Sequence, residues 1–247
     1  MGKVAVATRK GLFTFDTADA CLLNSAFVGE PVSAVLVNDT GRRWIAALRL
    51  GHYGVKLHRS DNGGVSWRDI ATPQYPPKPR HVDDPNPWTL DQVWVLEGFH
   101  PMAPQRIWAG TIPGGLFRSD DAGASWTLVR ALWDQPSRPR WFGGGYDHPG
   151  VHSICIHPQN PDDIVVGISC GGIWRSQDGG ESWTVGTGMR ANFMPPENQL
   201  NPEAQDPHRL VQCAARPERM WVQHHCGIWL SDDRGATWQE ITDAQPS

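Results

Sequence analysis

The nine residues "RSDDAGASW" at positions 118–126 occur four times along the chain with small changes. The other copies read "RSDNGGVSW" at 59–67, "RSQDGGESW" at 175–183 and "LSDDRGATW" at 230–238. Their first shared residues, Ser60, Ser119, Ser176 and Ser231, follow one another at intervals of 59, 57 and 55 residues. Self-similarity at such a period is typical of repeat architectures, in which each repeat forms one supersecondary unit.

Short apolar segments surround each copy. One precedes it, a second leads into it after a glycine, and a third follows its tryptophan, as in "RWIAALRL" at 43–50, "GVKLHRS" at 54–60 and "SWRDIA" at 66–71. Short runs bounded by turn residues indicate strands. We therefore expect four strands per repeat, with the copied stretch as the tight turn between the third and fourth. The opening residues 3–16 fit the second and third strands of a more divergent first unit.

The residue types in the copied stretch suit a tight turn. The side chain of Asp121 can accept hydrogen bonds from backbone amides two residues further on, which fixes the loop. The glycine at position 123 can supply the positive φ that a tight turn needs, and Trp126 can pack back across the turn. Because chemistry rarely needs four equivalent copies on one chain, the pattern indicates a structural role.

Composition agrees with a sheet protein. The 247 residues include 26 Gly, 21 Pro and 13 Trp. Frequent Gly and Pro indicate many turns, which favours short strands over helices. Four-stranded sheets at this period predict an all-β fold, a β-propeller forming one domain over 1–247. We expect about five blade units, near 1–30, 31–72, 91–131, 151–187 and 208–243. Because the first unit lacks its innermost strand, we expect a truncated propeller or an open arc that exposes apolar sheet faces.

Several classes of function are disfavoured. The net charge is −4 and no run of Lys or Arg is present, so we expect no nucleic-acid partner. The N-terminus lacks the apolar core of a secretory signal, and no segment approaches the ~18 apolar residues of a membrane span. Five cysteines, an odd number without close pairs, favour reduced thiols and a cytoplasmic location.

The repeated stretch resembles the Asp-box, or BNR, repeat of sialidases, sortilin-type propellers and photosystem-assembly propellers. Longer segments, among them "GGGYDHPGVHS" at 143–153 and "HHCGIWLSDD" at 224–233, are similar to bacterial WD40/YVTN/BNR-like repeat proteins. Such proteins are often labelled glycosyl hydrolases or exo-alpha-sialidases. The resemblance implies a propeller fold, but the Asp box is structural in sialidases as well. The F/Y-R-I-P motif of true sialidases is absent, so we do not expect sialidase chemistry.

Candidate functional residues concentrate on the face opposite the repeated turns. Antiparallel strands send the long connections 68–91, 127–150 and 184–208 to that face, and long loops in compact folds are often functional. Histidine beside a carboxylate suits proton transfer. The candidate catalytic residues are Asp147, Asp206, His152 and His208. The candidate ligand-binding residues are Arg9, Lys10, His52, His148, His224, His225, Trp141 and Tyr146.

Two functions remain open. The first is a binding propeller whose histidine-rich mouth takes a small polar ligand, a glycan or a protein partner. The alternative is a hydrolase, glycosidase-like, or a lyase that uses the Asp and His residues as acid–base pairs. Histidines near Gly and Pro can also simply hydrogen-bond loop backbones, and a mouth plugged by side chains would indicate a scaffold. No H-E-x-x-H or C-x-x-C spacing is present, so we expect neither a metal site nor a cofactor.

Overall fold

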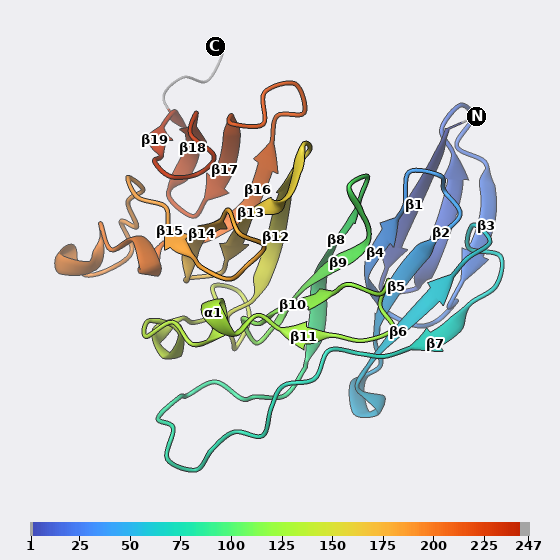
Figure 1. Ribbon diagram of the computed structural model, residues 1–247, viewed down its shortest axis with the longest axis horizontal. Coiled ribbons are helices and arrows are strands. Elements are labelled where there is room, and N and C mark those ends of the chain that lie inside the picture. The colour runs from blue at the N-terminus through green and yellow to red at the C-terminus, as the bar shows by residue number, and fades with distance from the viewer. Residues whose placement is uncertain (1, 243–247) are drawn as a thin grey trace.

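The computed structural model describes residues 2–242 and contains five antiparallel sheets (Figure 1). The first sheet holds β1 (Lys3–Thr8), β2 (Gly11–Asp16) and β3 (Leu22–Ala26). The second holds β4 (Val32–Val37), β5 (Trp44–Arg49), β6 (Val55–Ser60) and β7 (Arg68–Ile70). The third holds β8 (Gln92–His100), β9 (Ala103–Ile112), β10 (Leu116–Ser119) and β11 (Thr127–Leu128). The fourth holds β12 (Val151–His157), β13 (Asn160–Ile168), β14 (Gly172–Ser176) and β15 (Thr184–Val185). The fifth holds β16 (Pro207–Gln212), β17 (Met220–His224), β18 (Gly227–Ser231) and β19 (Gln239–Glu240).

In every sheet the strands lie in chain order, each paired with the next, as the prediction of four-stranded antiparallel units requires. The first sheet has three strands among the described residues, which correspond to the second, third and fourth strands of the others. Residue 243, the end of the last expected unit, lies outside the described residues.

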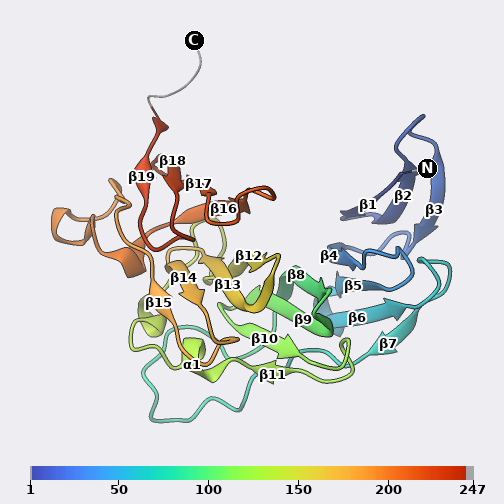
Figure 2. The same cartoon turned by 45° about the horizontal axis from the view of Figure 1, so that its top comes forward.

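The five sheets follow one another around an arc (Figure 2). Strand β4 contacts β8, β8 contacts β12, and β12 contacts β16, so the first strands of neighbouring sheets line the inner side of the arc. The first and fifth sheets form its two separate arms (Figures 1 and 2). The arrangement is therefore radial, as expected for propeller blades, and the arc is open.

Four apolar clusters hold the arc together, one between each pair of neighbouring sheets. Alternate residues of a middle strand enter different clusters: Trp44 of β5 packs toward the first sheet, whereas Ile45 packs toward the third. Both faces of such a strand are buried, which explains the near-continuous apolar run "WIAAL" at 44–48.

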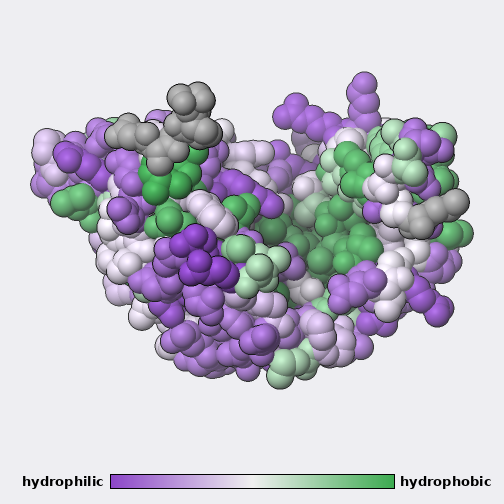
Figure 3. All heavy atoms as spheres, turned by 90° about the horizontal axis from the view of Figure 1, so that it is seen from above, coloured by the Kyte–Doolittle hydropathy of each residue, from purple (hydrophilic) through white to green (hydrophobic). Residues whose placement is uncertain are grey.

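Apolar side chains remain exposed on the two arms. Val4, Val6, Leu22 and Leu23 of the first sheet and Val211 and Ile228 of the fifth are each more than a third exposed. In Figure 3 the molecule is hollowed on one side of the arc, and hydrophobic residues gather in and beside this hollow. These exposed sheet residues are the surface that the sequence predicts for an open arc.

The copied stretch forms the same turn in all four complete sheets. In the copy at 176–183, the Ser176 hydroxyl accepts the Gly180 amide at 2.8 Å and donates to Asp178 Oδ1 at 2.7 Å. Asp178 Oδ1 also accepts the amide of Ser182, four residues further on, at 2.9 Å. The sequence predicted that this carboxylate accepts an amide two residues further on. The prediction was wrong, because the amide that it accepts lies four residues further on. The glycines of the four turns, Gly64, Gly123, Gly180 and Gly235, have φ values between 80° and 93°.

The tryptophan that ends each copy packs back across the turn in three of the four. The indole nitrogens of Trp67, Trp183 and Trp238 donate to the carbonyl of the turn glycine at 3.0–3.2 Å. Trp126 instead donates to the carbonyl of Ala71 in the preceding sheet at 2.9 Å.

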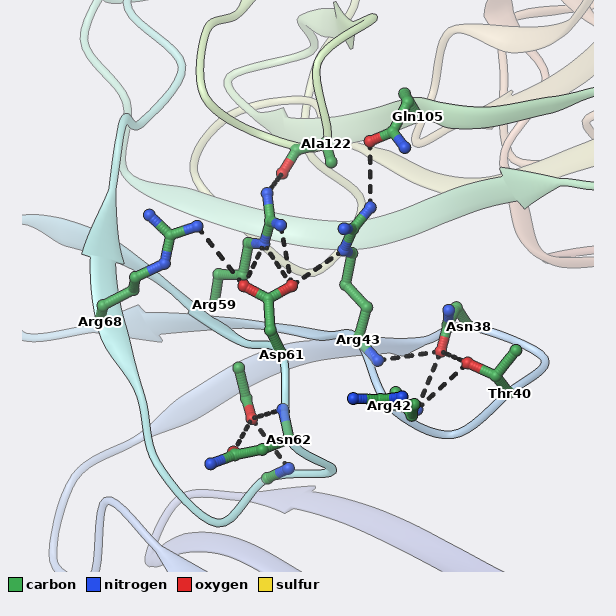
Figure 4. Close-up of polar contacts among 12 residues, drawn as sticks. Asn38, Thr40, Arg42, Arg43, Arg59, Asp61, Asn62, Arg68, Gln105 and Ala122 are labelled. Carbon is green, nitrogen blue, oxygen red and sulfur yellow. Dashed lines mark hydrogen bonds and ion pairs between the residues drawn. The ribbon is translucent and has the colours of Figure 1, made fainter.

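Arginines connect each turn to the next sheet. Arg59 donates to the Ala122 carbonyl at 3.3 Å and also binds Asp61 at 2.8 Å (Figure 4). Arg43 donates to the same Asp61 carboxylate at 3.0 Å. Hydrogen bonds from Arg59 and Arg43 lower the pKa of Asp61 to about 2. The same position in the next two sheets repeats the connection, from Arg118 to the Gly179 carbonyl and from Arg175 to the Asp233 carbonyl.

Two of the three long connections contain short helical segments. The connection 127–150 contains α1 (Arg130–Trp133) and η2 (Arg138–Arg140), and the connection 184–208 contains η3 (Pro196–Asn198) and η4 (Pro202–Ala204). A further short segment, η1 (Gly51–Tyr53), lies in the β5–β6 loop. A buried ion pair between Arg138 and Asp84, at 2.7 Å, ties two of the connections together. Trp88 Nε1 also donates to Asp84, and the Arg138 guanidinium lies 3.9 Å from the centre of the Trp133 ring. Among the described residues, no helix has the length and apolar character needed to cross a bilayer.

Candidate functional site

A cluster of one carboxylate and two imidazoles lies where the fifth sheet begins. Asp206 directly precedes β16 and is buried, with 3% of its surface exposed. Its Oδ1 accepts the backbone amide of Cys170 at 3.1 Å, which orients the carboxylate. Its Oδ2 lies 3.2 Å from His208 Nε2 and 3.6 Å from His225 Nδ1. We call Asp206, His208 and His225 the histidine cluster.

The two imidazoles of the histidine cluster face solvent. The side chains of His208 and His225 are 41% and 54% exposed, and their ring planes are nearly perpendicular. Gln223 Nε2 lies 3.2 Å from His208 Nδ1, and the exposed ring of Phe193 packs against His225 at 4.9 Å between centres. The carboxylate thus lies below the surface, while both imidazole side chains are exposed.

Two further histidines lie behind this cluster and are buried. Burial lowers the pKa of His152 to about 4, although the nearby carboxylate of Asp206 opposes this shift. Burial likewise lowers the pKa of His224 to about 4, again against Asp206. Both imidazoles are therefore neutral at pH 7. His152 Nδ1 lies 2.9 Å from the Ser153 hydroxyl, and its Nε2 has no hydrogen-bond partner among the described residues.

A pocket of about 570 Å³ lies on the same strand ends, at the first three sheets. Its polar lining includes Arg9 from the β1–β2 turn, Arg49 at the end of β5, and Asp91 and Gln92 at the start of β8. Arg49 Nη2 donates to both carboxylate oxygens of Asp91, at 3.0 Å to Oδ1 and 2.8 Å to Oδ2. Tyr146, which is 41% exposed, adds an aromatic ring. We call this the arginine pocket.

Tyr146 lines the arginine pocket and also contacts residues outside it. Its ring packs on Trp94 at 4.9 Å between centres, and Trp94 in turn lies 5.7 Å from His152. A smaller pocket of about 320 Å³ shares Arg49, Asp91 and Tyr146 with the arginine pocket and adds Asp147 and His148. Two carboxylates, those of Asp91 and Asp147, therefore line one cavity.

The sequence candidates thus fall into two groups rather than one. Asp206, His208 and His225 come together, with His152 and His224 behind them, whereas Arg9, Tyr146, Asp147 and His148 line the two pockets. Lys10 and His52 are exposed on the same face, Lys10 beside Arg9 and His52 in η1. Trp141 is 2% exposed and packs against Trp174, so its ring belongs to the core.

Sequence reasoning missed Arg49 and Asp91. Arg49 stands directly before the "LGHYG" loop that contains His52, and Asp91 directly precedes β8 in the position that Asp206 holds before β16. Aligning the residues just before each first strand would have found Asp91. The ion pair itself joins residues 42 positions apart, and nothing in the local sequence signals it.

Two kinds of chemistry are available on this face. An imidazole 3.2 Å from a carboxylate can transfer a proton, and the pair at His208 and Asp206 has this geometry. The arginine pocket offers charged groups and an exposed ring, which suits the binding of a polar ligand.

Known proteins similar to this chain include enzymes that act on carbohydrates. A sialidase from Bacteroides fragilis (strain YCH46) is 27% identical over 165 residues, which are 57% of this chain and 30% of that protein. An oligoxyloglucan-reducing end-specific xyloglucanase from Emericella nidulans is 22% identical over 160 residues, 58% of this chain and 18% of that protein. The chain spans less than a third of the length of these curated relatives. No protein-family model matches the sequence.

Solved structures with the same architecture cover most of the chain. An ancestral GH74 enzyme superposes with a TM-score of 0.56 at 19% identity, covering 85% of this chain and 24% of that one. YCF48 from Cyanidioschyzon merolae gives a TM-score of 0.53 at 13% identity, covering 92% and 65%. The extracellular domain of a hybrid two-component system from B. thetaiotaomicron gives 0.58 at 13% identity, covering 93% and 26%. These likenesses confirm the predicted β-propeller fold class.

Proposed function

We propose that this chain binds a carbohydrate in the arginine pocket. The observation that carries the proposal is the lining of that pocket, where Arg9, Asp91 and Gln92 lie beside the exposed ring of Tyr146. Charged and amide groups can hydrogen-bond sugar hydroxyls, and an exposed aromatic ring can pack against the apolar face of a sugar. The pocket volume of about 570 Å³ lies within the usual range for small-ligand sites. Similarity to a sialidase and to xyloglucanases supports a sugar as the ligand.

Calorimetric titration with xyloglucan oligosaccharides and, separately, with sialyllactose tests the proposal. We expect one of the two to bind and the substitution Tyr146→Ala to weaken binding at least tenfold, about 1.4 kcal/mol, through loss of the stacking ring. Phe142→Ala is the matched control, because Phe142 is also 41% exposed and lies in the same connection but outside the pocket lining. The proposal fails if neither sugar binds, or if Tyr146→Ala binds as well as the unmodified chain.

Glycoside hydrolysis is the second candidate function. It is favoured by Asp91 and Asp147, two acidic residues that line one cavity, because glycoside hydrolysis uses a pair of carboxyl groups. Release of reducing ends from xyloglucan oligosaccharides measures this activity. We expect Asp147→Asn to remove turnover while sugar binding persists, since the substitution keeps the shape of the side chain. Unchanged turnover in Asp147→Asn would exclude this carboxylate as the acid or nucleophile.

We also infer that the four repeated turns are Asp boxes. The support is the recurrence of the same serine, aspartate and glycine hydrogen bonds, together with the sequence resemblance. Asn62 replaces the aspartate in the first copy and keeps the geometry, since its Oδ1 accepts the Ser66 amide at 2.9 Å. Ser66→Ala and Asp178→Ala should therefore lower thermal stability without altering sugar binding, as expected for structural turns.

A further inference from the structure

Each side chain of the histidine cluster has one atom that could bind a metal ion, and the three atoms lie close together. Asp206 Oδ2, His208 Nε2 and His225 Nδ1 all lie within 4.8 Å of one another. We propose that they form a binding site for a divalent transition-metal cation such as Zn²⁺. The site is separate from the arginine pocket, so the proposal of metal binding can be tested independently of carbohydrate binding.

The distances fit three ligands on one cation. Zinc binds nitrogen and carboxylate oxygen at about 2.0–2.2 Å, which places neighbouring ligands of a tetrahedral site about 3.4 Å apart. The separations from Asp206 Oδ2 are 3.2 Å to His208 Nε2 and 3.6 Å to His225 Nδ1. The third separation, between His208 Nε2 and His225 Nδ1, is no more than 4.8 Å, and both rings are exposed side chains.

The surroundings of Asp206 prepare it for a cation. The Cys170 amide occupies Oδ1, which leaves Oδ2 directed at the imidazoles. Within the described residues, no Arg or Lys forms an ion pair with this buried carboxylate. A buried carboxylate without a fixed positive partner is costly, and a bound cation removes that cost.

The neighbouring polar groups also suit a metal site. Metal-bound histidines usually have their second ring nitrogen hydrogen-bonded, and Gln223 lies 3.2 Å from His208 Nδ1. If His208 Nε2 binds the cation, Nδ1 carries the proton, and the Gln223 amide can turn over to accept it.

The donor set indicates which cations fit. Two imidazole nitrogens and one carboxylate oxygen favour Zn²⁺, Co²⁺ or Ni²⁺ over the hard cations Mg²⁺ and Ca²⁺, which prefer oxygen ligands alone. Three protein ligands leave at least one position for water or for a ligand oxygen. The sequence indicated these three residues as functional candidates but not as metal ligands, because they lie two and then seventeen residues apart and match neither H-E-x-x-H nor C-x-x-C.

Titration of the metal-free 247-residue chain with ZnCl₂, and Co²⁺ absorption in the visible range, test the proposal. We expect one Zn²⁺ per chain and a Co²⁺ spectrum with imidazole ligation. His208→Ala and His225→Ala should each weaken Zn²⁺ binding at least ~10–100-fold, and Gln223→Ala about tenfold. His52→Ala, which removes another exposed histidine from the same face, should bind Zn²⁺ as the unmodified chain does.

Both exposed histidines can be replaced without disturbing a packed core, so failure to fold does not obscure the result. Circular dichroism of each variant verifies that the sheets are intact. The proposal is overturned if the unmodified chain takes up neither Zn²⁺ nor Co²⁺, or if the His208→Ala and His225→Ala variants retain its affinity.

Discussion

The two ends of the sheets differ in how they are built. At one end the four repeated turns use the same bonds: the serine hydroxyl accepts the glycine amide at 2.8–2.9 Å in every copy. At the other end each connection is different in length, composition and contacts, and both pockets and the histidine cluster lie there. Repetition therefore accompanies structural turns, and variation accompanies the candidate sites.

One position makes the contrast sharper. Asp91 and Asp206 both directly precede a first strand, β8 and β16, so they are structural equivalents. Asp91 is half-buried and pairs with Arg49, whereas Asp206 is buried and faces two imidazoles. The same place in the repeat thus carries a carboxylate paired with an arginine in one sheet and a carboxylate that faces two histidines in another. This difference separates the arginine pocket from the proposed metal site.

The largest effect is expected at the irregular end. Arg138→Ala leaves the buried Asp84 carboxylate without its partner and should lower the free energy of unfolding by about 3–5 kcal/mol. Urea unfolding measures the change. Arg140→Ala is the control, because its exposed pair with Glu203 at 3.7 Å is worth at most about 1 kcal/mol. Equal losses in the two variants would mean that the buried pair does not hold the connections together.

A smaller effect is expected in a repeated turn. Ser176→Ala leaves the Gly180 amide without its acceptor inside a buried turn and should lower the free energy of unfolding by about 1–3 kcal/mol. Thermal or urea unfolding measures it. Thr40→Ala, which removes an exposed hydroxyl from a different loop, should stay within about 0.5 kcal/mol of the unmodified chain. A loss no greater than that of Thr40→Ala would contradict the structural role of the turn.

The smallest effect at neutral pH is expected for Asp178→Asn, because Asn62 already serves in the equivalent turn. The substitution should change the free energy of unfolding by less than about 1 kcal/mol at pH 7. Hydrogen bonds from the Ser182 hydroxyl and amide lower the pKa of Asp178 from 3.8 to about 2.

The carboxylate of Asp178 is the favoured form in the folded chain. Its contribution is therefore complete above about pH 4 and is lost as the pH falls toward 2. Asp178→Asn should accordingly reduce the slope of stability against pH between 4 and 2, measured by urea unfolding at several pH values. An identical slope in the variant and the unmodified chain would argue against this carboxylate as a source of acid sensitivity.

The fold was predictable because the information that determines it is local and repeated. Ser119, Asp121 and Gly123 lie within five residues, and their side chains and φ angle define the turn without distant partners. The prediction erred on which amide the aspartate accepts, and on Trp126, whose indole donates to the Ala71 carbonyl and not across its own turn. The helical turns inside the long connections were not predicted, since no periodic pattern marks them.

The site was less predictable because distant packing determines it. Asp206 and His208 are close in sequence, but His225 joins them only through the β17–β18 turn. Trp141 was predicted as a ligand-binding residue, yet its ring is buried and packs against Trp174. Arg49 and Asp91 meet across two sheets, and such pairs depend on the spacing between sheets that sequence patterns do not contain.

The arginines that reach from one turn to the next give the arc a direction. Arg59, Arg118 and Arg175 each donate forward to a carbonyl of the following sheet, and the residue at that place in the last copy is Leu230. Each middle sheet therefore supplies an arginine donor to the following sheet and a carbonyl acceptor to the preceding one. A duplicated copy of such a sheet would carry both the donor and the acceptor that its new contacts need. The arrangement therefore favours growth of the array by whole repeats.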